Sequence, residues 1–293
     1  MFCYNLHNIG IESDINLLLN AIEREAFNNL DKKILISSKK SKEGYKFEKN
    51  FFVESNYGHA LIAQKNLFKA SVKNNGRDIS VDYYSNKNCL NLSRRILGTV
   101  IPFSLHQMGR LVLHASAIEK DGKAILFLGN SGSGKSSLAA SLQSYNFITE
   151  DIASIEDHDG ICRVVPSFPF IKLTKRIAET YSVNNKEKIY LKNDRLKRSF
   201  YRVNNFVSKP VSINKCVFLQ WGNNSNIHEL NSTETLEMLL KSYIGAFPID
   251  SCRQSSSIFM SFFEKLSKQA NFFKFTRKLD ESKDINKEIK QIL

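Results

Sequence analysis

Eight residues near the middle of the chain have the types and spacing that bind phosphate. They read Gly129-Asn130-Ser131-Gly132-Ser133-Gly134-Lys135-Ser136 and match the Walker A pattern G-x-x-x-x-G-K-[ST] at every defined position. The glycines allow the backbone to fold tightly, so that successive N–H groups converge on phosphate oxygens. The lysine places a positive charge on the β and γ phosphates, and the serine hydroxyl is a ligand for Mg²⁺. The motif predicts a nucleoside triphosphate site, and we include the adjoining Ser137 in it.

Two consecutive carboxylates, Glu150 and Asp151, follow the next short apolar run along the chain. A carboxylate at this place can hold Mg²⁺ or its waters, and a second can accept the proton of an attacking hydroxyl. We therefore predict Ser136 and Glu150 as metal ligands and Asp151 as a catalytic base. Adjacent strand residues point to opposite faces, so both can serve only if the backbone turns there. The alternative is that one of them is a solvated charge at a strand end.

His114 is the remaining candidate for chemistry, because it interrupts an otherwise apolar run from Leu111 to Ile118. If this run pairs through a tight turn near Asp121 with the strand that precedes the glycine-rich motif, the imidazole falls beside the loop. There it could contact the γ-phosphate or orient a carboxylate. The alternative is a histidine that is satisfied within the core.

The elements needed to position these residues can be predicted from the pattern. Residues 111–118 and 124–128 predict two strands joined by a tight turn over 119–123. The motif then leads into a helix over 136–144 and a strand over 147–149. This strand–loop–helix context disfavours the alternative that the motif is merely a glycine-rich surface loop. A hairpin follows, with strands at 152–155 and 161–165.

The hairpin before the loop distinguishes this chain from enzymes that approach a Walker A loop through parallel strands. Together, the residues 113–117, 121–124, 127–139 and Glu150-Asp151 resemble the kinase core of HPr kinase/phosphorylase. They are more similar to its relatives found with lasso-peptide and other ribosomal-peptide biosynthesis genes. The opening from Tyr4 to Asp14, and Pro166-Ser167-Phe168-Pro169 followed by Lys172-Leu173, also resemble those peptide-modifying kinases.

The resemblance implies an α/β fold: a phosphoenolpyruvate-carboxykinase-like P-loop kinase core with a mixed sheet, behind a smaller β-rich N-terminal domain. It implies transfer of the ATP γ-phosphate to a serine, and in the peptide-tailoring group to the C-terminal serine of a precursor peptide. The catalytic set would be His114, Lys135, Glu150 and Asp151. This chain departs from the family in having Glu150 where Asp-Asp is usual, and in a slightly shorter stretch before that pair. The segment with which the HPr enzyme grips its protein substrate is not found.

The first hundred residues are β-rich, with strand-like runs at 51–53, 61–63 and 79–84 between turn formers at 56–58 and 74–76. A 3.6-residue apolar period predicts a helix over 14–27. A second helical stretch runs from about Leu90 to Gly109, kinked at Pro102. The tail over 257–279 alternates a helical pattern with Phe-rich runs. We predict an N-terminal domain over 1–100 and a kinase domain over 101–293.

Composition bounds the class of protein. The chain has 293 residues, 42% hydrophobic and 24% charged, which excludes collagenous or wholly disordered proteins. No apolar run approaches the roughly 20 residues of a membrane span, and the start does not resemble a secretory signal. Five cysteines are widely spaced without a CxxC pair, so we expect reduced thiols and a cytoplasmic protein (Cys3, Cys89, Cys162, Cys216, Cys252).

The net charge of +13 indicates an anionic partner. Between Lys172 and Arg202 there are ten basic residues against three acidic ones, which could steer an acidic peptide or a carboxylate terminus, or could be a solvated loop. Nucleic acid is disfavoured because aromatic residues are few there and no recognition motif appears. Arg253 and Lys209 are further candidates to reach a phosphate. A homo-oligomer remains open.

The leading hypothesis is therefore a kinase that uses ATP and Mg²⁺ to phosphorylate a serine on a small ribosomally made peptide. A second reading keeps the fold and changes the acceptor to a folded protein or a small molecule. A third is a nucleotide-gated binding protein that is catalytically idle. Transfer of several phosphates or of a nucleotidyl group would use the same loop.

Overall fold

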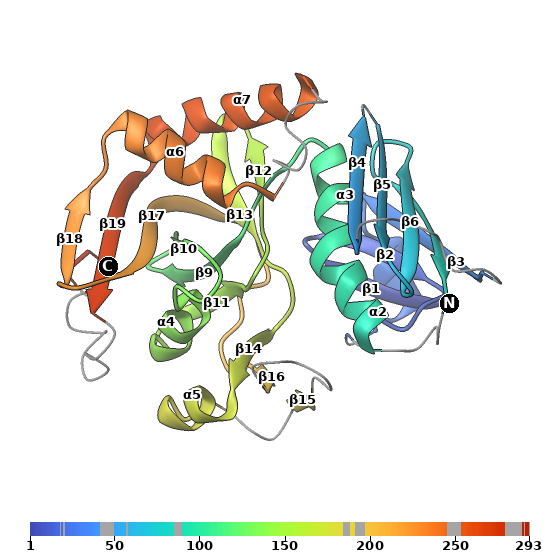
Figure 1. Ribbon diagram of the computed structural model, residues 1–293, viewed down its shortest axis with the longest axis horizontal. Coiled ribbons are helices and arrows are strands. Elements are labelled where there is room, and N and C mark those ends of the chain that lie inside the picture. The colour runs from blue at the N-terminus through green and yellow to red at the C-terminus, as the bar shows by residue number, and fades with distance from the viewer. Residues whose placement is uncertain are drawn as a thin grey trace. The chain divides into compact units, whose positions relative to one another are not determined.

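The computed structural model describes the chain except for residues 18, 20, 42–49, 57, 85–89, 184–187, 191–196, 245–252, 279–288, 290 and 293. The side chains of 56, 188–190 and 253–255 are likewise not described. The chain forms two compact units (Figure 1). Unit 1 comprises Met1–Val112 and Ile244–Met260, and unit 2 comprises Leu113–Tyr243 and Ser261–Leu293.

Unit 1 is built on a seven-stranded mixed sheet in the order β1-β2-β3-β7-β6-β5-β4. The sheet joins parallel pairs (β2 with β3, β3 with β7) to antiparallel hairpins. Its strands are β1 (Phe2–Leu6), β2 (Ile9–Ser13), β3 (Lys33–Lys40), β4 (Phe51–Asn56), β5 (His59–Gln64), β6 (Phe68–Lys73) and β7 (Asp78–Tyr83). The three strand predictions at 51–53, 61–63 and 79–84 are confirmed in β4, β5 and β7.

The helix predicted over 14–27 is wrong for most of its length. Only α1 (Arg24–Asn28) is helical, and the described residues between 14 and 23 are not. The amide of Ile15 donates to Ser13 Oγ and that of Leu17 to Tyr4 Oη, both at 3.0 Å. Side chains of neighbouring elements thus take the hydrogen bonds that a helix would make within itself. Ile15 and Leu17 are fully buried, so tertiary packing overrides the helical period.

The second helical stretch is confirmed, in three consecutive pieces. They are α2 (Leu90–Arg95), a π-helical turn η1 (Ile96–Val100) and α3 (Ile101–Gln107). Pro102 lies at the start of α3, directly after the π-helical turn, so its missing N–H falls where the hydrogen-bond pattern of the helix changes. Gly109 follows with φ +83°, the left-handed conformation that glycine adopts without strain.

Unit 2 is built around a nine-stranded mixed sheet. Its main path is β11-β9-β10-β17-β13-β12-β8, and β19 pairs with β17 and with β18. A separate three-stranded sheet has the order β14-β16-β15. The strands are β8 (Leu111–Leu113), β9 (Ala115–Lys120), β10 (Lys123–Leu128), β11 (Asn146–Thr149), β12 (Ala153–His158), β13 (Ile161–Val165), β14 (Phe170–Thr174), β15 (Lys188–Tyr190), β16 (Arg198–Arg202), β17 (Val211–Gly222), β18 (Asn226–Glu229) and β19 (Asn271–Lys278). The helices are α4 (Lys135–Ser141), α5 (Lys175–Thr180), α6 (Ser232–Ser242) and α7 (Arg253–Gln269), the last running across the boundary between the units. The α/β class with a mixed sheet is therefore correct.

The predicted antiparallel approach to the glycine-rich loop is confirmed. β9 and β10 pair from Lys123↔Lys120 to Leu128↔Ala115, and the turn between them has positive φ at Asp121 and Gly122. One detail differs: the predicted strand over 111–118 is interrupted at His114. There the peptide N–H of His114 donates to Ser242 O at 2.7 Å and leaves the β9–β10 ladder. The helix after the loop is also shorter than predicted, ending at Ser141.

On its other side β10 pairs with a parallel strand, β17, which in turn pairs with parallel β19. β10 ends at Leu128, opposite Phe218, whereas β17 continues to Gly222 and β19 to Lys278. These two strands thus run on beyond the point where the glycine-rich loop begins. Ligands of open α/β sheets bind at this carboxyl end of the strands.

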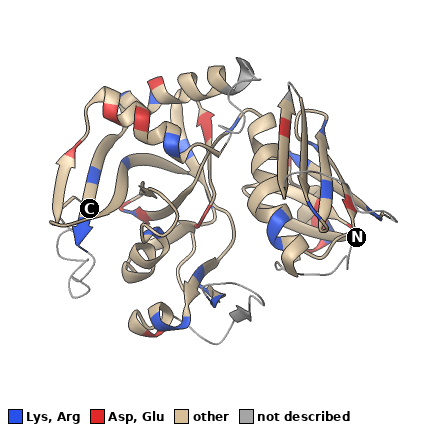
Figure 2. Ribbon diagram, viewed as in Figure 1, with Lys and Arg blue, Asp and Glu red and all other residues tan. Residues whose placement is uncertain are grey.

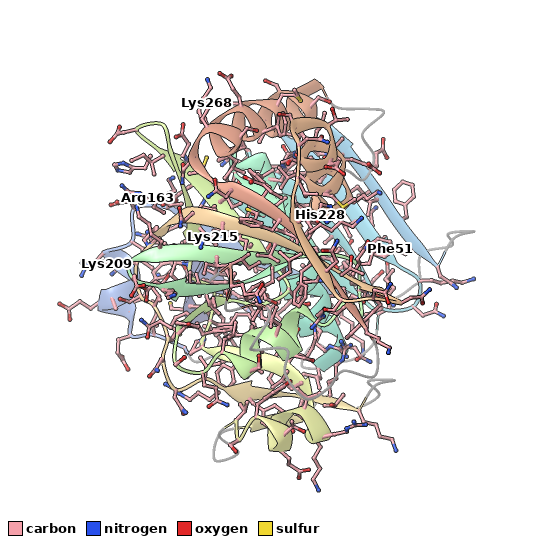
Figure 3. All side chains as sticks on the ribbon, turned by 90° about the vertical axis from the view of Figure 1, so that its left-hand side faces the viewer. Phe51, Arg163, Lys209, Lys215, His228 and Lys268 are labelled. Carbon is pink, nitrogen blue, oxygen red and sulfur yellow. The ribbon has the colours of Figure 1, made fainter. Side chains whose placement is uncertain are left out.

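The remaining sequence predictions for unit 2 are largely confirmed. The hairpin at 152–165 is β12 and β13, and the tail over 257–279 forms α7 and β19. Phe259, Phe262, Phe272 and Phe275 are buried, whereas Phe263 and Phe273 are partly exposed. Figure 3 shows how densely the side chains fill the space around the sheet. In the part of the chain that is described, no helix is long and apolar enough to cross a membrane.

The cysteines in the described residues are free thiols. Cys3, Cys162 and Cys216 are buried and unbonded to one another. Burial raises the pKa of the Cys162 thiol to about 11 and that of Cys216 still further. Cys89 and Cys252 lie outside the described residues.

Candidate functional site

The glycine-rich loop leaves the end of β10 and enters α4 at Lys135. Gly129, Gly132 and Gly134 have φ values of +132°, +84° and +88°, so the three glycines occupy the positions that need left-handed or related backbone. The Lys135 ammonium turns back into the loop and donates to Gly129 O at 2.7 Å and Asn130 O at 3.1 Å. Burial lowers the pKa of Lys135 to about 8, against the opposing pull of Asp151 and Glu150. A bound polyphosphate would stabilise this buried charge.

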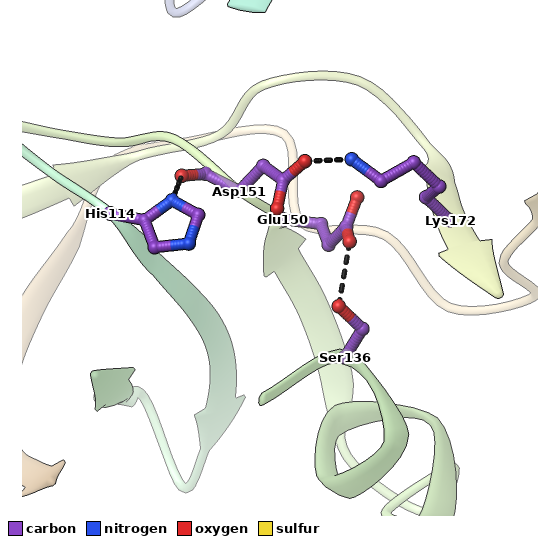
Figure 4. Close-up of polar contacts among 5 residues, drawn as sticks. All are labelled: His114, Ser136, Glu150, Asp151 and Lys172. Atoms are coloured by element: carbon purple, nitrogen blue, oxygen red, sulfur yellow. Dashed lines mark hydrogen bonds and ion pairs between the residues drawn. The ribbon is translucent and has the colours of Figure 1, made fainter. Parts of the chain in front are cut away.

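Ser136, in the first turn of α4, contacts the first of the two carboxylates. Its Oγ donates to Glu150 Oε1 at 2.7 Å (Figure 4). Glu150 lies just after β11 and is only 4% exposed. Burial and the neighbouring Asp151 raise its pKa to about 7, although Lys172 and the Ser136 hydroxyl act in the opposite direction. Both residues predicted as metal ligands are therefore in contact.

The backbone turns at Asp151, as the prediction that both carboxylates serve requires. Asp151 has φ +63°, and the amide of Ile152 donates to Glu150 O at 2.7 Å across it. Few non-glycine residues adopt this conformation, although Asp tolerates it better than most. The turn sends Glu150 toward Ser136 and leaves 37% of the Asp151 side chain exposed. One carboxylate is thus buried against the loop helix and the other faces solvent.

Lys172 was not among the predicted catalytic residues, yet its ammonium pairs directly with Asp151 Oδ2 (Figure 4). It lies on β14 with 12% of its side chain exposed. Burial alone would lower the pKa of Lys172, but Glu150 and Asp151 raise it above its ordinary value. Burial would likewise raise the pKa of Asp151, yet Lys172 holds it below its usual range. Both partners are therefore ionised. The sequence signal was a single lysine within a basic run.

His114, at the break between β8 and β9, reaches the same turn. Its Nδ1 lies 3.1 Å from the backbone carbonyl oxygen of Asp151. Because a carbonyl only accepts, Nδ1 carries the proton in this contact. Burial and the Lys135 charge lower the pKa of His114, although Asp151 opposes this. The ring is thus neutral at pH 7, and its Nε2 keeps a lone pair. His114 fixes the backbone that carries Asp151.

The arrangement fits Mg²⁺. Among the described residues, no group of three or more His, Cys, Asp or Glu side chains gathers to hold a metal ion. Ser136 Oγ and Glu150 Oε1 instead offer two oxygen ligands 2.7 Å apart, beside the phosphate loop. Mg²⁺ is commonly held by one or two such protein oxygens, with substrate phosphates and water completing an octahedron.

Two side chains from the extended ends of β17 and β19 also contact the loop, and neither was predicted. Trp221 Nε1 donates to Gly132 O at 2.8 Å, and the Arg277 guanidinium donates through Nη2 to Ser133 O. They face each other in the strand register. The signal that could have found them is the register of parallel strands, which needs the pairing to be known.

The other predicted residues are placed less centrally. Asn130 and Ser131 are exposed at the loop tip, and Ser137 is partly exposed on α4. Lys209 does not lie near the glycine-rich loop. It is exposed just before β17, whose first residues pair with the start of β10, so it lies at the opposite end of these strands from the loop (Figure 3). The side chain of Arg253 is outside the described residues.

Part of the basic run forms one face of the small sheet. Lys172 pairs in register with Phe200, so Arg198 and Arg202, two residues to either side of Phe200, project from the same face as Lys172. Figure 2 shows the blue segments of β14, β16 and α5 gathered in this part of unit 2. We call Lys172, Arg198 and Arg202 the cationic face. Its first member, Lys172, forms the ion pair with Asp151. Residues 184–187 and 191–196 of the run lie outside the described residues.

No family model matches this chain, and no curated protein matches it. Among solved structures, it is similar to the HPr(Ser) kinase/phosphatase from Coxiella burnetii, with 10% sequence identity and a TM-score of 0.33. That similarity covers 62% of this chain and 87% of the other.

Proposed function

We propose that this protein is a Mg²⁺–ATP-dependent kinase that transfers the γ-phosphate to a hydroxyl group. The observation that carries the proposal is that two consecutive carboxylates lie in different environments. Glu150 is buried and hydrogen-bonded to Ser136 at the end of the glycine-rich loop, and Asp151 is partly exposed beside it. A protein that only binds nucleotide needs one acidic group here, whereas phosphoryl transfer uses a second to receive the proton of the acceptor.

Each residue then has a role derived from its contacts. Lys135 and the loop amides hold the β and γ phosphates, and Ser136 and Glu150 would hold the metal. Mg²⁺, when bound there, would supply positive charge that neutralises the charge developing during transfer. Lys172 keeps Asp151 ionised, and His114 fixes the turn that presents it. Most of the rate enhancement comes from positioning and charge stabilisation.

The reaction balances with these groups. The acceptor oxygen forms a bond to the γ-phosphorus while the bond from that phosphorus to the β,γ-bridging oxygen breaks, which releases ADP. The hydroxyl proton passes to the Asp151 carboxylate. The product is a phosphate monoester.

As acceptor we propose a serine of a small ribosomally made peptide, in the first instance its C-terminal serine. A C-terminal serine carries its own carboxylate beside the hydroxyl. The cationic face of Lys172, Arg198 and Arg202 starts at the proposed base and would attract that carboxylate. This charge pattern supports an anionic acceptor, and the resemblance of the loop region to peptide-tailoring kinases supports a peptide. We also propose a cytoplasmic location, because the cysteines among the described residues are free thiols.

The test is intact mass spectrometry of peptides incubated with Mg²⁺ and ATP. Three peptides should be compared: one with a C-terminal serine, the same peptide amidated at its C-terminus, and one ending in alanine. We expect a gain of one or more phosphates on the first only. Lys135→Ala and Asp151→Asn should abolish the gain, and Lys209→Ala should not, because that lysine lies at the other end of the strands. Normal transfer by Lys135→Ala would refute the kinase.

One observation favours a second candidate, a catalytically idle nucleotide-gated binder: the carboxylate of Asp151 is paired with Lys172, so one of its oxygens is engaged in an ion pair. This candidate predicts ATP binding without transfer to any peptide, folded protein or small molecule. It also predicts that Asp151→Asn leaves ATP affinity unchanged.

A further inference from the structure

The C-terminal ends of strands β17 and β19 lie beside the glycine-rich loop. Leu128, the last residue of β10, pairs with Phe218 of β17, and β17 continues for four more residues. Within this extension Trp221 pairs with Arg277 of β19. The loop that follows Leu128 must therefore pass beside the Trp221–Arg277 pair.

The side chains of Trp221 and Arg277 bind two successive carbonyls of the loop. Trp221 Nε1 donates to Gly132 O at 2.8 Å, and Arg277 Nη2 donates to Ser133 O. The Arg277 guanidinium also lies over the Trp221 ring, with Cζ 4.4 Å from the ring centroid. A Cβ added to Gly134 would collide with the guanidinium, so the loop backbone packs directly on it.

Arg277 is a buried cation that pairs with no carboxylate among the residues that the structure describes. It is 3% exposed, and its Nε and Nη1 have no hydrogen-bond partner among the described residues. None of the ion pairs in the described residues includes it. A buried, unpaired charge is costly unless something neutralises it. Consistent with this, burial lowers the pKa of Arg277 to about 10.

The contact with Ser133 O connects this charge to the phosphate side of the loop. In a trans peptide the C=O and the N–H point in opposite directions. A cation on Ser133 O therefore polarises the peptide group so that the Gly134 N–H, on its other side, becomes a stronger donor. The Gly134 amide is one of those expected to bind phosphate.

We propose that Arg277 is a positioning residue of the nucleotide site, a second cation that Trp221 holds behind the phosphate loop and that stabilises bound triphosphate through the Ser133–Gly134 peptide. This inference rests on the proposed function, because it presumes that the loop binds a nucleoside triphosphate. According to this proposal, the buried charge of Arg277 serves to bind triphosphate and not to stabilise the sheet. Trp221, in turn, keeps the guanidinium against the loop.

The test measures affinity for Mg²⁺–ATP and for inorganic tripolyphosphate by calorimetry at low and high salt. Arg277→Met keeps the shape of the stem without the charge, and Arg277→Lys keeps the charge without the planar fork. Lys278→Met is the control, since it removes an exposed charge from the next residue of the same strand. We expect Arg277→Met to lower the affinity for both ligands to the same extent, roughly tenfold to a hundredfold. This is the range for loss of a hydrogen bond to a charged group. Compared with Arg277→Met, Arg277→Lys should recover the salt dependence of binding seen in the native chain and part of its affinity.

The sole tryptophan provides a readout that does not need a variant to fold. Because Trp221 touches both the loop and Arg277, tripolyphosphate should change its fluorescence in the native protein, although this ligand has no base to stack on it. No change while tripolyphosphate binds would refute the inference. So would a folded Arg277→Met protein with affinity within twofold of the native chain, or loss of affinity with the salt dependence unaltered. If the folded native chain binds neither ligand, the proposed function itself fails.

Discussion

The ammonium of Lys172 on β14 pairs with the carboxylate of Asp151, 21 residues earlier in the chain. Asp151 stands at φ +63°, in a turn whose backbone carbonyl also contacts His114. The carboxylate is thus fixed from two directions while 37% of its side chain remains exposed. An ionised and partly exposed carboxylate is what the proposed transfer from ATP to a hydroxyl requires of its base.

Removing the Lys172 charge should impair transfer and shift its pH dependence. Lys172 holds the pKa of Asp151 below its usual range, so Lys172→Met should raise that pKa. Because the proposed reaction needs ionised Asp151, the acidic limb of the kcat/KM profile should move to higher pH. We also expect kcat/KM near neutral pH to fall by roughly tenfold to a hundredfold, as for loss of a contact to a charged group. Lys175→Met, which removes a lysine whose side chain is 78% exposed, is the control. An unshifted acidic limb in Lys172→Met would contradict this role.

Glu150 should make the unliganded protein less stable as pH rises. Its folded pKa is about 7, above the ordinary 4.5, so between these values the folded state binds more protons than the unfolded state. The free energy of unfolding therefore decreases as pH rises through this range. Glu150→Gln removes the effect and should be more stable than the native chain at pH 8, by up to about 3 kcal/mol, with a smaller difference at pH 5. Urea unfolding at both pH values measures this. Glu229→Gln, an exposed position, should show no such trend.

Substitution of two loop glycines distinguishes the effect of backbone strain from that of steric collision. Gly134 and Gly132 have φ values of +88° and +84°, but an added Cβ collides with Arg277 only at Gly134 and meets nothing within 4 Å at Gly132. Gly132→Ala should lose about 1–2 kcal/mol of stability from the left-handed backbone alone. Gly134→Ala should lose more, and should also weaken Mg²⁺–ATP binding at least tenfold, because either the loop or the Arg277 guanidinium must shift and the contact at Ser133 O is disturbed. Equal effects of the two substitutions, measured by thermal unfolding and calorimetry, would show that Arg277 does not press on the loop.

The same comparison can be made in unit 1, away from the site. Gly76 has φ +87°, and a Cβ there would collide with the backbone oxygen of Ser104, which cannot rotate away. Gly109 has φ +83° and open space around it. We expect Gly76→Ala to lower the free energy of unfolding by several kcal/mol and Gly109→Ala by about 1–2 kcal/mol. Neither substitution should alter the affinity of the folded protein for tripolyphosphate.

Much of the site follows from local sequence. The Walker A pattern required a tight loop between a buried strand and a helix, and Gly129 to Ser136 form that loop. The apolar strand before Glu150 brought this carboxylate to Ser136, because the chain from α4 to β11 is short. The hairpin of β9 and β10 was predictable from Asp121-Gly122, a turn that pairs two strands adjacent in sequence. All of these contacts span few residues, so periodicity and turn chemistry suffice.

The remaining part depended on long-range pairing. The apolar period over 14–27 predicts a helix, but Tyr4, Ser13 and the burial of Ile15 and Leu17 impose another conformation. Lys172 reaches Asp151 only because β14 packs beside the turn, and Lys209 is excluded only because β10 and β17 run parallel. Arg277 lies 144 residues after Ser133 and contacts it through strand register alone.

The sequence by itself therefore determined which backbone forms the glycine-rich loop and which carboxylates stand near it, since those properties reside in residue type and short spacing. Tertiary structure decided which cations complete the site. A lysine or arginine carries the same charge wherever it stands in the chain, and only the pairing of distant strands selects Lys172 and Arg277 from the 42 basic residues.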